Sequence, residues 1–133
     1  MKTVHVAAAI IEKDHQILIA KRLKGTHKDL WEFPSGKIEE NESSKQALIR
    51  EIKEELGLDV VKAKYMSSRY YQPKDVLMLN FIVVVEENRP IKLNEEIAEA
   101  RWCSPEEALQ LIRKGTTAEQ FLVSAIKELK RKI

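Results

Sequence analysis

The chain has 133 residues, of which 44% are hydrophobic and 33% charged, and this composition is that of an ordinary globular protein with room for a core. A net charge of +2 is too small to make nucleic acid or an anionic membrane the main partner, and the sequence contains no run of about eighteen apolar residues that could span a membrane. The only cysteine, Cys103, excludes an internal disulfide and fits a reducing cytoplasm. We therefore expect a single domain over residues 1–133, cytoplasmic, monomeric or homodimeric, with no membrane contact and no stable nucleic-acid partner.

The first part of the chain predicts two strands and a loop. Residues 3–12 are β-rich, and we interpret them as a strand rather than a signal peptide, because no convincing cleavage site follows. Residues 16–22 alternate as a second strand, and the polar residues 23–30 predict a loop. The stretch WEFPSGK at residues 31–37 follows as an extended segment with a turn at its proline.

Residues 43–56 carry the strongest helix signal. Ser43 and Gln46 match a capping box, and Gly57 is placed to end the helix in a left-handed conformation. Because polar residues alternate with apolar ones at helical spacing, one side of this helix should face a core.

The second half of the chain predicts further strands and two helices. We expect strands at residues 60–71, 76–85 and 100–103, with a polar loop at residues 86–96. Capping boxes predict that a second helix begins after Ser104 and that a third begins at Thr117 with Gln120 as its partner. Strands interrupted and followed by helices indicate an α/β or α+β sandwich, with helices packed on a mixed sheet.

The helix at residues 43–56 also carries three acids that converge on one face. Glu51, Glu54 and Glu55 stand at i, i+3 and i+4, so their like charges repel. An isolated run of this kind is often only a solvated helix face. A divalent cation offers the alternative, because it removes the repulsion and takes carboxylate oxygens as ligands.

The spacing around these acids matches a known family. The segment from Gly36 to Leu58 resembles the Nudix box at all nine specified positions over 23 residues. The matching residues are Gly36, Glu42, Arg50, Glu51, Ile52, Glu54, Glu55, Gly57 and Leu58. The flanking stretches AAAIIEKDHQILIAKR, WEFPSGKIE and RWCSPEEAL are similar to MutT-type nucleoside triphosphate pyrophosphohydrolases, and the CTP pyrophosphohydrolase branch looks particularly close. The resemblance implies an α/β/α sandwich around a mixed sheet.

The resemblance also implies the metal and its ligands. Family members use Mg²⁺ or Mn²⁺, and Glu51, Glu54 and Glu55 match the positions of the carboxylate ligands. Ser35 occupies a position that is usually glycine, whose carbonyl binds the metal. Because a left-handed conformation would strain a serine, we expect φ below zero at Ser35 and a carbonyl aimed at Glu51 and Glu55.

Catalytic roles follow from the same resemblance. Glu51, or an acid further from the metal, would deprotonate the attacking water, and Glu54 is matched to the catalytic carboxylates as well. Arg50 would orient these acids by charge-assisted hydrogen bonds. Glu42 would support the turn or an outer metal. In the acidic loop NEEIAEARW we select Glu96 over Glu95 and Glu99 as the additional acid.

Substrate contacts are the last set of expectations. Arg22 and His27 match phosphate-contacting positions, and Phe33 matches the base-contacting aromatic. Of Trp31 and Phe33, one should face the core and the other the base. Pro34 and Gly36 would shape the turn beside the substrate. Glu119 would accept hydrogen bonds from a base edge; the alternatives are a first-turn helix acid and an alignment shifted by one residue.

The function implied is hydrolysis of a (d)NTP to the nucleoside monophosphate and pyrophosphate, which would clean the nucleotide pool. The substrate would be 8-oxo-dGTP or a modified or ordinary (d)CTP. Alternatives are a Nudix domain that binds a nucleotide without hydrolysis and a Nudix hydrolase of another nucleoside diphosphate derivative. Because all the acids of the box are present, the sequence favours the enzyme.

Overall fold

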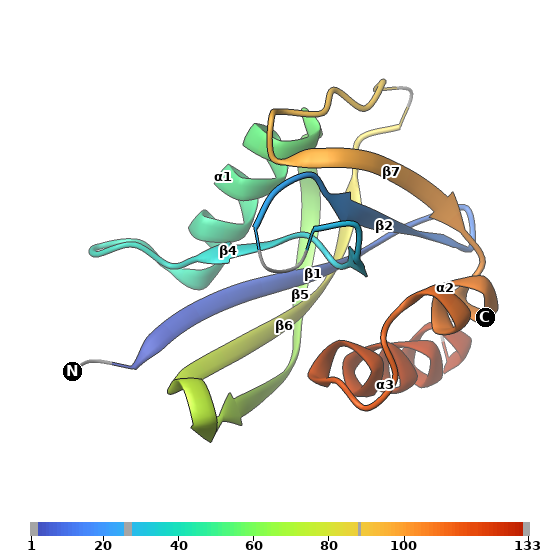
Figure 1. The fold of residues 1–133 in the computed structure, drawn as a ribbon. Helices are drawn as coiled ribbons and strands as arrows, with labels where there is room; N and C mark the ends of the chain where they lie inside the picture. The colour runs from blue at the N-terminus through green and yellow to red at the C-terminus, as the bar shows by residue number, and fades with distance from the viewer. Residues whose placement is uncertain (1–2, 26–27, 88, 132–133) are drawn as a thin grey trace.

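The structure is a computed structural model that describes residues 3–25, 28–87 and 89–131. Within these ranges, no helix is both long enough and apolar enough to cross a membrane. The elements follow one another as labelled in Figure 1. In chain order they are β1 (Val4–Lys13), β2 (Gln16–Arg22), β3 (Trp31–Glu32), β4 (Ser35–Lys37), α1 (Ser44–Leu56), β5 (Val60–Tyr71), the 3₁₀ turn η1 (Gln72–Lys74), β6 (Val76–Val85), β7 (Ile97–Cys103), α2 (Pro105–Leu111) and α3 (Thr117–Arg131).

The strands form one mixed sheet around β1. The path through the described strands is β3-β2-β1-β6-β5, with β4 paired to β1 and β7 paired to β2. The β1–β6 pair is parallel, from Val4 opposite Val76 to Glu12 opposite Val84, and the other pairs are antiparallel. A parallel pair buried on both faces is expected to be apolar, and the centres of β1 and β6 are apolar except for Asn80.

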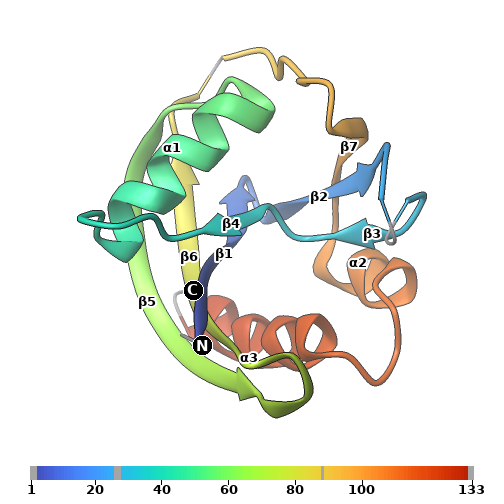
Figure 2. The ribbon, with the colours of Figure 1, turned by 60° about the vertical axis from the view of Figure 1, so that its left-hand side comes forward.

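Helices cover both faces of the sheet, as Figure 2 shows. On one face, Leu48, Ile52 and Leu56 of α1 are buried against side chains that include Phe81 of β6. On the other face, α3 contributes a second cluster with α2 and the alternate residues of the same strands, including Ile82. The neighbours Phe81 and Ile82 point to opposite faces because side chains alternate along a strand. The predicted α/β/α sandwich around a mixed sheet is confirmed.

Three local predictions need correction. The segment after Pro34 is not a simple turn, because residues 35–37 pair with β1 as a strand. The last strand begins at Ile97 rather than at residue 100, since it pairs along β2 as far as Arg22. The third helix is capped by Thr116, whose Oγ1 accepts the Glu119 N–H at 3.2 Å, rather than by Thr117. The first two corrections depend on partners that are distant in sequence.

Candidate active site

Helix α1 presents the predicted acids because both of its ends are fixed. Ser43 and Gln46 form the expected capping box, with hydrogen bonds of 3.1 and 2.8 Å, and Gly57 ends the helix at φ 70°. After the helix, the Lys92 N–H donates to the Leu56 carbonyl at 2.8 Å. The apolar stripe faces the sheet, so the acidic face lies beside the 31–42 segment.

Arg50 is the centre of the acid cluster. Its Nε donates to Glu42 at 2.8 Å, and its Nη1 donates to Glu51 at 2.7 Å. Its Nη2 donates to both Glu42 at 3.0 Å and the Lys37 carbonyl at 3.1 Å. Glu54 lies further off, with its carboxylate 3.6 Å from Nη1. The five-donor fork of arginine suits this arrangement, and a lysine could not reproduce it.

The charge of Arg50 governs the ionisation of Glu42. The hydrogen bond from Arg50 lowers the pKa of Glu42 to about 2, and the Glu39 backbone N–H helps. In return, the carboxylates of Glu42 and Glu51 raise the pKa of the Arg50 guanidinium. Glu42 also accepts the Glu39 N–H at 3.0 Å, so it ties the loop before α1 to the helix. This agrees with the expectation that Glu42 supports the turn.

Gly36 lies against Glu51 so closely that no side chain fits between them. A Cβ built on Gly36 would overlap the carboxyl group of Glu51. The adjacent Ser35 lies in β4 and is not among the positive-φ residues, so the expectation of a negative φ there is confirmed. Its neighbours hold the strand to β1, through Ala9 N–H to the Pro34 carbonyl and Ile38 N–H to the His5 carbonyl, each at 2.9 Å. In this alternation the Ser35 carbonyl points away from β1.

Glu55 is the most deeply buried carboxyl group of the helix, at 5% exposure. Burial raises its pKa to about 8, and the negative charge and hydrogen bond of Glu51 add to the rise. The charge of Arg22 opposes this shift, whereas that of Glu96 reinforces it. The loop that carries Glu96 contacts the helix directly, since the Asn94 N–H donates to the Glu55 carbonyl at 3.2 Å. Glu99 is instead directed to Lys21 and Arg101.

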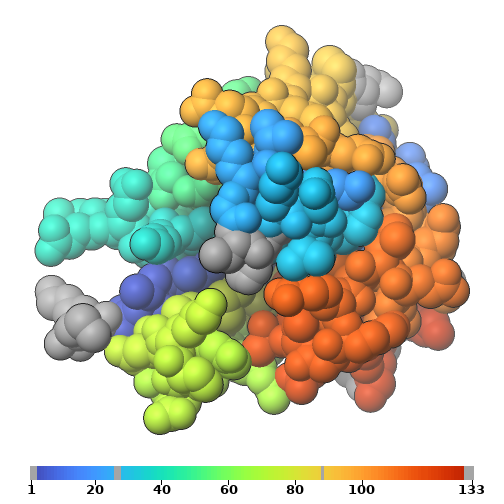
Figure 3. Space-filling view, viewed as in Figure 1, coloured from blue at the N-terminus to red at the C-terminus, as the bar shows by residue number. Residues whose placement is uncertain are grey.

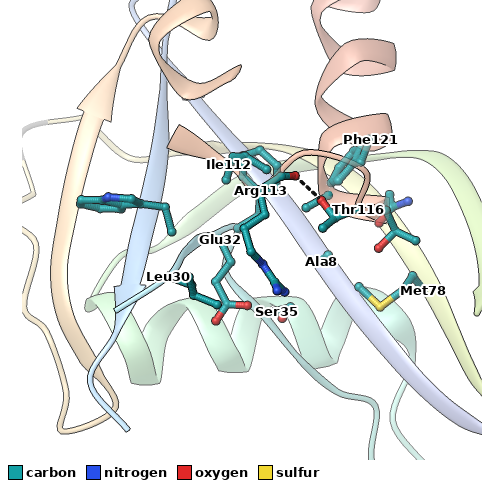
Figure 4. A pocket seen from close by; sticks show the side chains of 14 residues that line it. Ala8, Leu30, Glu32, Ser35, Met78, Ile112, Arg113, Thr116 and Phe121 are labelled. Atoms are coloured by element: carbon teal, nitrogen blue, oxygen red, sulfur yellow. Dashed lines mark hydrogen bonds between the residues drawn. The ribbon is translucent and has the colours of Figure 1, made fainter. Parts of the chain in front are cut away.

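Beside this cluster lies a hollow of about 200 Å³ between the sheet and the start of α3. Ser35 lines the hollow, and the next residue, Gly36, lies against Glu51. The most buried lining residues include Phe33 and Asn80, which are only 5% and 6% exposed. In Figure 4 the Arg113 side chain extends across the opening toward Glu32 and Ser35. The hollow has the size of a base ring rather than of a whole nucleotide, since complete ligand sites usually start at about 300 Å³.

We expected one of the rings of Trp31 and Phe33 to face the core and the other to face the base, and this expectation is wrong. Both border this hollow and pack on the same core cluster, because residues two apart in an extended chain share a face. Phe33 meets Phe121 edge to face at 5.8 Å. Trp31 is further out, with Lys21 and Arg101 each 5.0 Å from its ring centre.

The structure does not bring Glu119 to the hollow. Its Oε1 accepts the Gly115 N–H at 2.9 Å, and its Oε2 lies 3.6 Å from Lys114 Nζ. Glu119 is therefore the acid of the first helical turn, and the hollow is lined instead by Ala118, one residue earlier.

Four other residues were predicted to contact the substrate, and two of them, Pro34 and Gly36, lie outside the lining of the hollow. Pro34 uses its carbonyl to pair with β1 and, like Gly36, does not line the hollow. His27 lies outside the described residues. Arg22 donates its Nε–H to Glu32, a residue that borders the hollow.

Sequence reasoning missed Asn80, Glu32 and Arg113. Asn80 could have been predicted, since it is the one polar residue in the strand VLMLNFIVVV. Burying an amide costs free energy unless it finds a hydrogen-bond partner, so such a residue indicates a site. Its Nδ2 donates to Ser67 at 3.4 Å, a long contact. Arg113 lies between two helices and gave no signal, because loop residues meet a site only through tertiary packing.

Comparison with known proteins identifies these features. The model of the NUDIX domain matches residues 1–124. The chain is 41% identical over 112 residues to the CTP pyrophosphohydrolase of Escherichia coli (strain K12), covering 83% of this chain and 82% of that protein. It is 40% identical over 88 residues to the 8-oxo-dGTP diphosphatase of Proteus vulgaris, covering 64% and 79%. The solution structure of the E. coli ORF135 protein superposes with a TM-score of 0.79 at 34% identity, over 99% of this chain and 94% of that one.

Proposed function

The chain belongs to the NUDIX family, and we propose that this nucleotide pyrophosphohydrolase cleaves (d)NTPs to the nucleoside monophosphate and pyrophosphate as one domain in the cytoplasm. The observation that carries the proposal is the acid cluster organised by Arg50 on α1, directly beside a hollow of base size. A nucleotide with its base in the hollow would direct its phosphates past Ser35 toward the acids.

Nudix hydrolases generally use divalent metal ions, and the residues here fit one. Burial, reinforced by the negative charge and hydrogen bond of Glu51, raises the pKa of Glu55 to about 8, so two carboxyl groups meet here at a cost in free energy. A divalent cation would remove that repulsion. Within the described ranges, no three acidic, histidine or cysteine side chains are already gathered in a metal-binding arrangement. Mg²⁺ typically takes one or two carboxylates and keeps water and phosphate oxygens as its other ligands.

We assign Mg²⁺ or Mn²⁺ to Glu51, Glu54, Glu55 and the Ser35 carbonyl. When bound, the ion neutralises charge on the phosphoryl oxygens and lowers the pKa of a water ligand. The protein residues do the rest. Arg50 holds Glu51 in place, and Gly36 leaves the space that Glu51 occupies.

In the reaction, a water oxygen forms a new P–O bond at one of the two phosphorus atoms of the α–β anhydride, and the bridging P–O bond breaks. The proton of the water passes to the acid cluster, in which we assign Glu54 and Glu96 as acceptors in addition to Glu51. The Glu54 side chain is 57% exposed and held only by its 3.6 Å pair with Arg50, so it is open to water. Arg22, near Glu55, would contact a phosphate.

For the base, Phe33 supplies a stacking surface and Asn80 supplies both a donor and an acceptor. A side-chain amide can hydrogen-bond to any base edge that offers both a donor and an acceptor. We therefore propose 8-oxo-dGTP and ordinary or modified (d)CTP as the substrates to compare. The biological role would be removal of unwanted nucleotides from the pool.

The test is a panel of common and oxidised (d)NTPs with Mg²⁺, with identification of both products. We expect Glu54→Gln to lose at least about 3 kcal/mol of transition-state stabilisation, or roughly a hundredfold in kcat. Glu106→Gln, an exposed helix acid on α2, is the matched control and should retain full activity. Turnover by Glu54→Gln at the wild-type rate would refute the ligand assignment, and release of inorganic phosphate with a diphosphate would refute the cleavage position.

A further inference from the structure

A second, larger hollow of about 660 Å³ adjoins the base hollow. It lies between the β5–β6 hairpin and the α2–α3 segment, which face each other on the surface shown in Figure 3. Among the residues that the structure describes, no aspartate or glutamate lines it. Its lining includes three cations and three uncharged side chains that can donate a hydrogen bond: Arg69, Lys74, Arg113, Tyr71, Thr117 and Gln120. The hollow therefore has the charge and the donors of an anion site.

The three cations of this hollow are not neutralised by neighbouring carboxylates. Within the described ranges, the ion pairs of the protein involve neither Arg69 nor Lys74 nor Arg113. Lys114, the next residue after Arg113, is by contrast paired with Glu119 at 3.6 Å. Cations that converge on one space without an acid repel one another, and an anionic group bound among them would remove this repulsion.

The register of the hairpin sets which side chains face this hollow. Arg69 lies opposite Met78, and Tyr71 lies opposite Val76. Residues opposite each other in a strand pair share a face, so Arg69 and Tyr71 lie on the face that carries Met78. Because Met78 lines both hollows, Arg69 lies near the boundary between them.

The end of the hairpin is anchored, so this wall is ordered before any ligand arrives. Asp75, at the turn, accepts from Tyr70 Oη at 2.7 Å and from Thr3 Oγ1 at 2.9 Å. Its carbonyl accepts the Val4 N–H at 3.0 Å. The backbone beside Lys74 is therefore fixed at the start of β1, and less of the chain must be ordered when an anion binds.

The larger hollow continues the base hollow on the side away from the acids. Four residues border both hollows: Met78, Arg113, Thr116 and Thr117. Ser35, whose neighbour Gly36 lies against Glu51, borders only the base hollow. A nucleotide with its triphosphate at the acids has its glycosidic bond on the Ser35 side, so the opposite edge of its base faces the larger hollow. In cytosine, that edge carries the amino group and the C5 carbon.

We propose that this enzyme accepts (d)CTP analogues whose cytosine carries a carboxylate-bearing side group on the edge away from the sugar, and that the larger hollow binds this group; this rests on the proposed function. Arg69 and Lys74 match the charge of the carboxylate, and Arg113 offers a guanidinium where the two hollows meet. The volume lies in the range of small-ligand sites, so a side group of several atoms fits. Water cleaves the same α–β anhydride, and the products are pyrophosphate and the nucleoside monophosphate with its side group unchanged.

The test uses three derivatives of dCTP that share one linker on C5. 5-Aminoallyl-dCTP ends in a cation, its N-succinyl derivative ends in a carboxylate, and its N-succinamoyl derivative ends in a neutral amide of the same shape as the carboxylate. We expect kcat/KM of the wild type to be at least about fivefold higher for the succinyl than for the succinamoyl derivative, since two exposed cations act together on the carboxylate. The aminoallyl compound should be a poorer substrate than both.

Variants of the hollow test whether its cations cause this preference. The double variant Arg69→Gln/Lys74→Gln should bring the ratio of succinyl to succinamoyl derivative near one, while kcat/KM for unmodified dCTP stays unchanged. Lys62→Gln, which removes an exposed cation at the other end of β5, is the matched control and should keep the wild-type ratio.

The outcomes separate this inference from the proposed function. A wild-type enzyme that cleaves dCTP but does not prefer the succinyl derivative overturns the inference alone, as does a preference that survives in the double variant or falls equally in Lys62→Gln. Cleavage of 8-oxo-dGTP without cleavage of any dCTP compound also overturns the inference alone. Failure to cleave any of these nucleotides with Mg²⁺ or Mn²⁺ overturns the inference and the proposed function together. A preference that is lost only in the double variant supports the inference.

Discussion

Phe33 provides a sharp test of the base hollow because the chain contains a matched control. Phe33 is 5% exposed and meets Phe121 edge to face at 5.8 Å. Phe81 is equally buried and meets Tyr65 edge to face at 5.7 Å, but on the opposite face of the sheet. Replacing each phenylalanine by leucine therefore makes the same chemical change, and only Phe33 borders the hollow.

The expected loss of stability is similar for the two variants. An edge-to-face pair contributes about 0.5–1.5 kcal/mol beyond area burial, and an apolar swap of nearly equal volume costs up to about 1.5 kcal/mol. Each variant should therefore lose about 2 kcal/mol of unfolding free energy. Phe33→Leu should also lose part of the stacking energy of the base, about 1 kcal/mol, which raises KM roughly fivefold.

Urea unfolding measures the first quantity, and initial rates over a range of substrate concentrations measure the second. Rates should be taken well below the unfolding transition, so that both variants remain folded. A KM that rises equally in Phe33→Leu and Phe81→Leu, or in neither, would show that Phe33 does not contact the base.

Three further predictions concern the acid cluster and the core. Gly36→Ala should lower kcat roughly a hundredfold, because the new methyl group displaces Glu51; Gly25→Ala, which has open space but a φ of 90°, should lose stability and keep its kcat. Since the pKa of Glu42 falls from an ordinary 4.5 to about 2 on folding, its contribution is full above pH 4.5 and lost as the pH falls toward 2. The difference in urea midpoint between wild type and Glu42→Gln should therefore narrow over that range, and a difference independent of pH would contradict this. Cys103 is 1% exposed and burial raises its thiol pKa, so thiol reagents should label it slowly in native protein and quickly in urea; rapid native labelling would show that the strand opens.

Much of this protein was predictable because its information is local. The caps of α1 and α2 depend on residues three apart, and the structure contains both as expected. The spacing of Glu51, Glu54 and Glu55 on one helix is equally local, since 3.6 residues per turn decides which side chains are neighbours. The role of Gly36 also follows from the box, although the reason for it, contact with Glu51, is seen only in three dimensions.

Tertiary structure alone decided the rest. Pairing with β1 made residues 35–37 a strand, and the fit of the α2–α3 loop against the sheet brought Arg113 to the base hollow. In the same loop, the Gly115 N–H donates to the Glu119 carboxylate, which therefore does not line the base hollow. The sequence by itself therefore determined the helix that carries the acids, because its contacts lie within a few turns. The walls that select a substrate were decided by contacts between residues far apart in the chain, whose pairing no local pattern records.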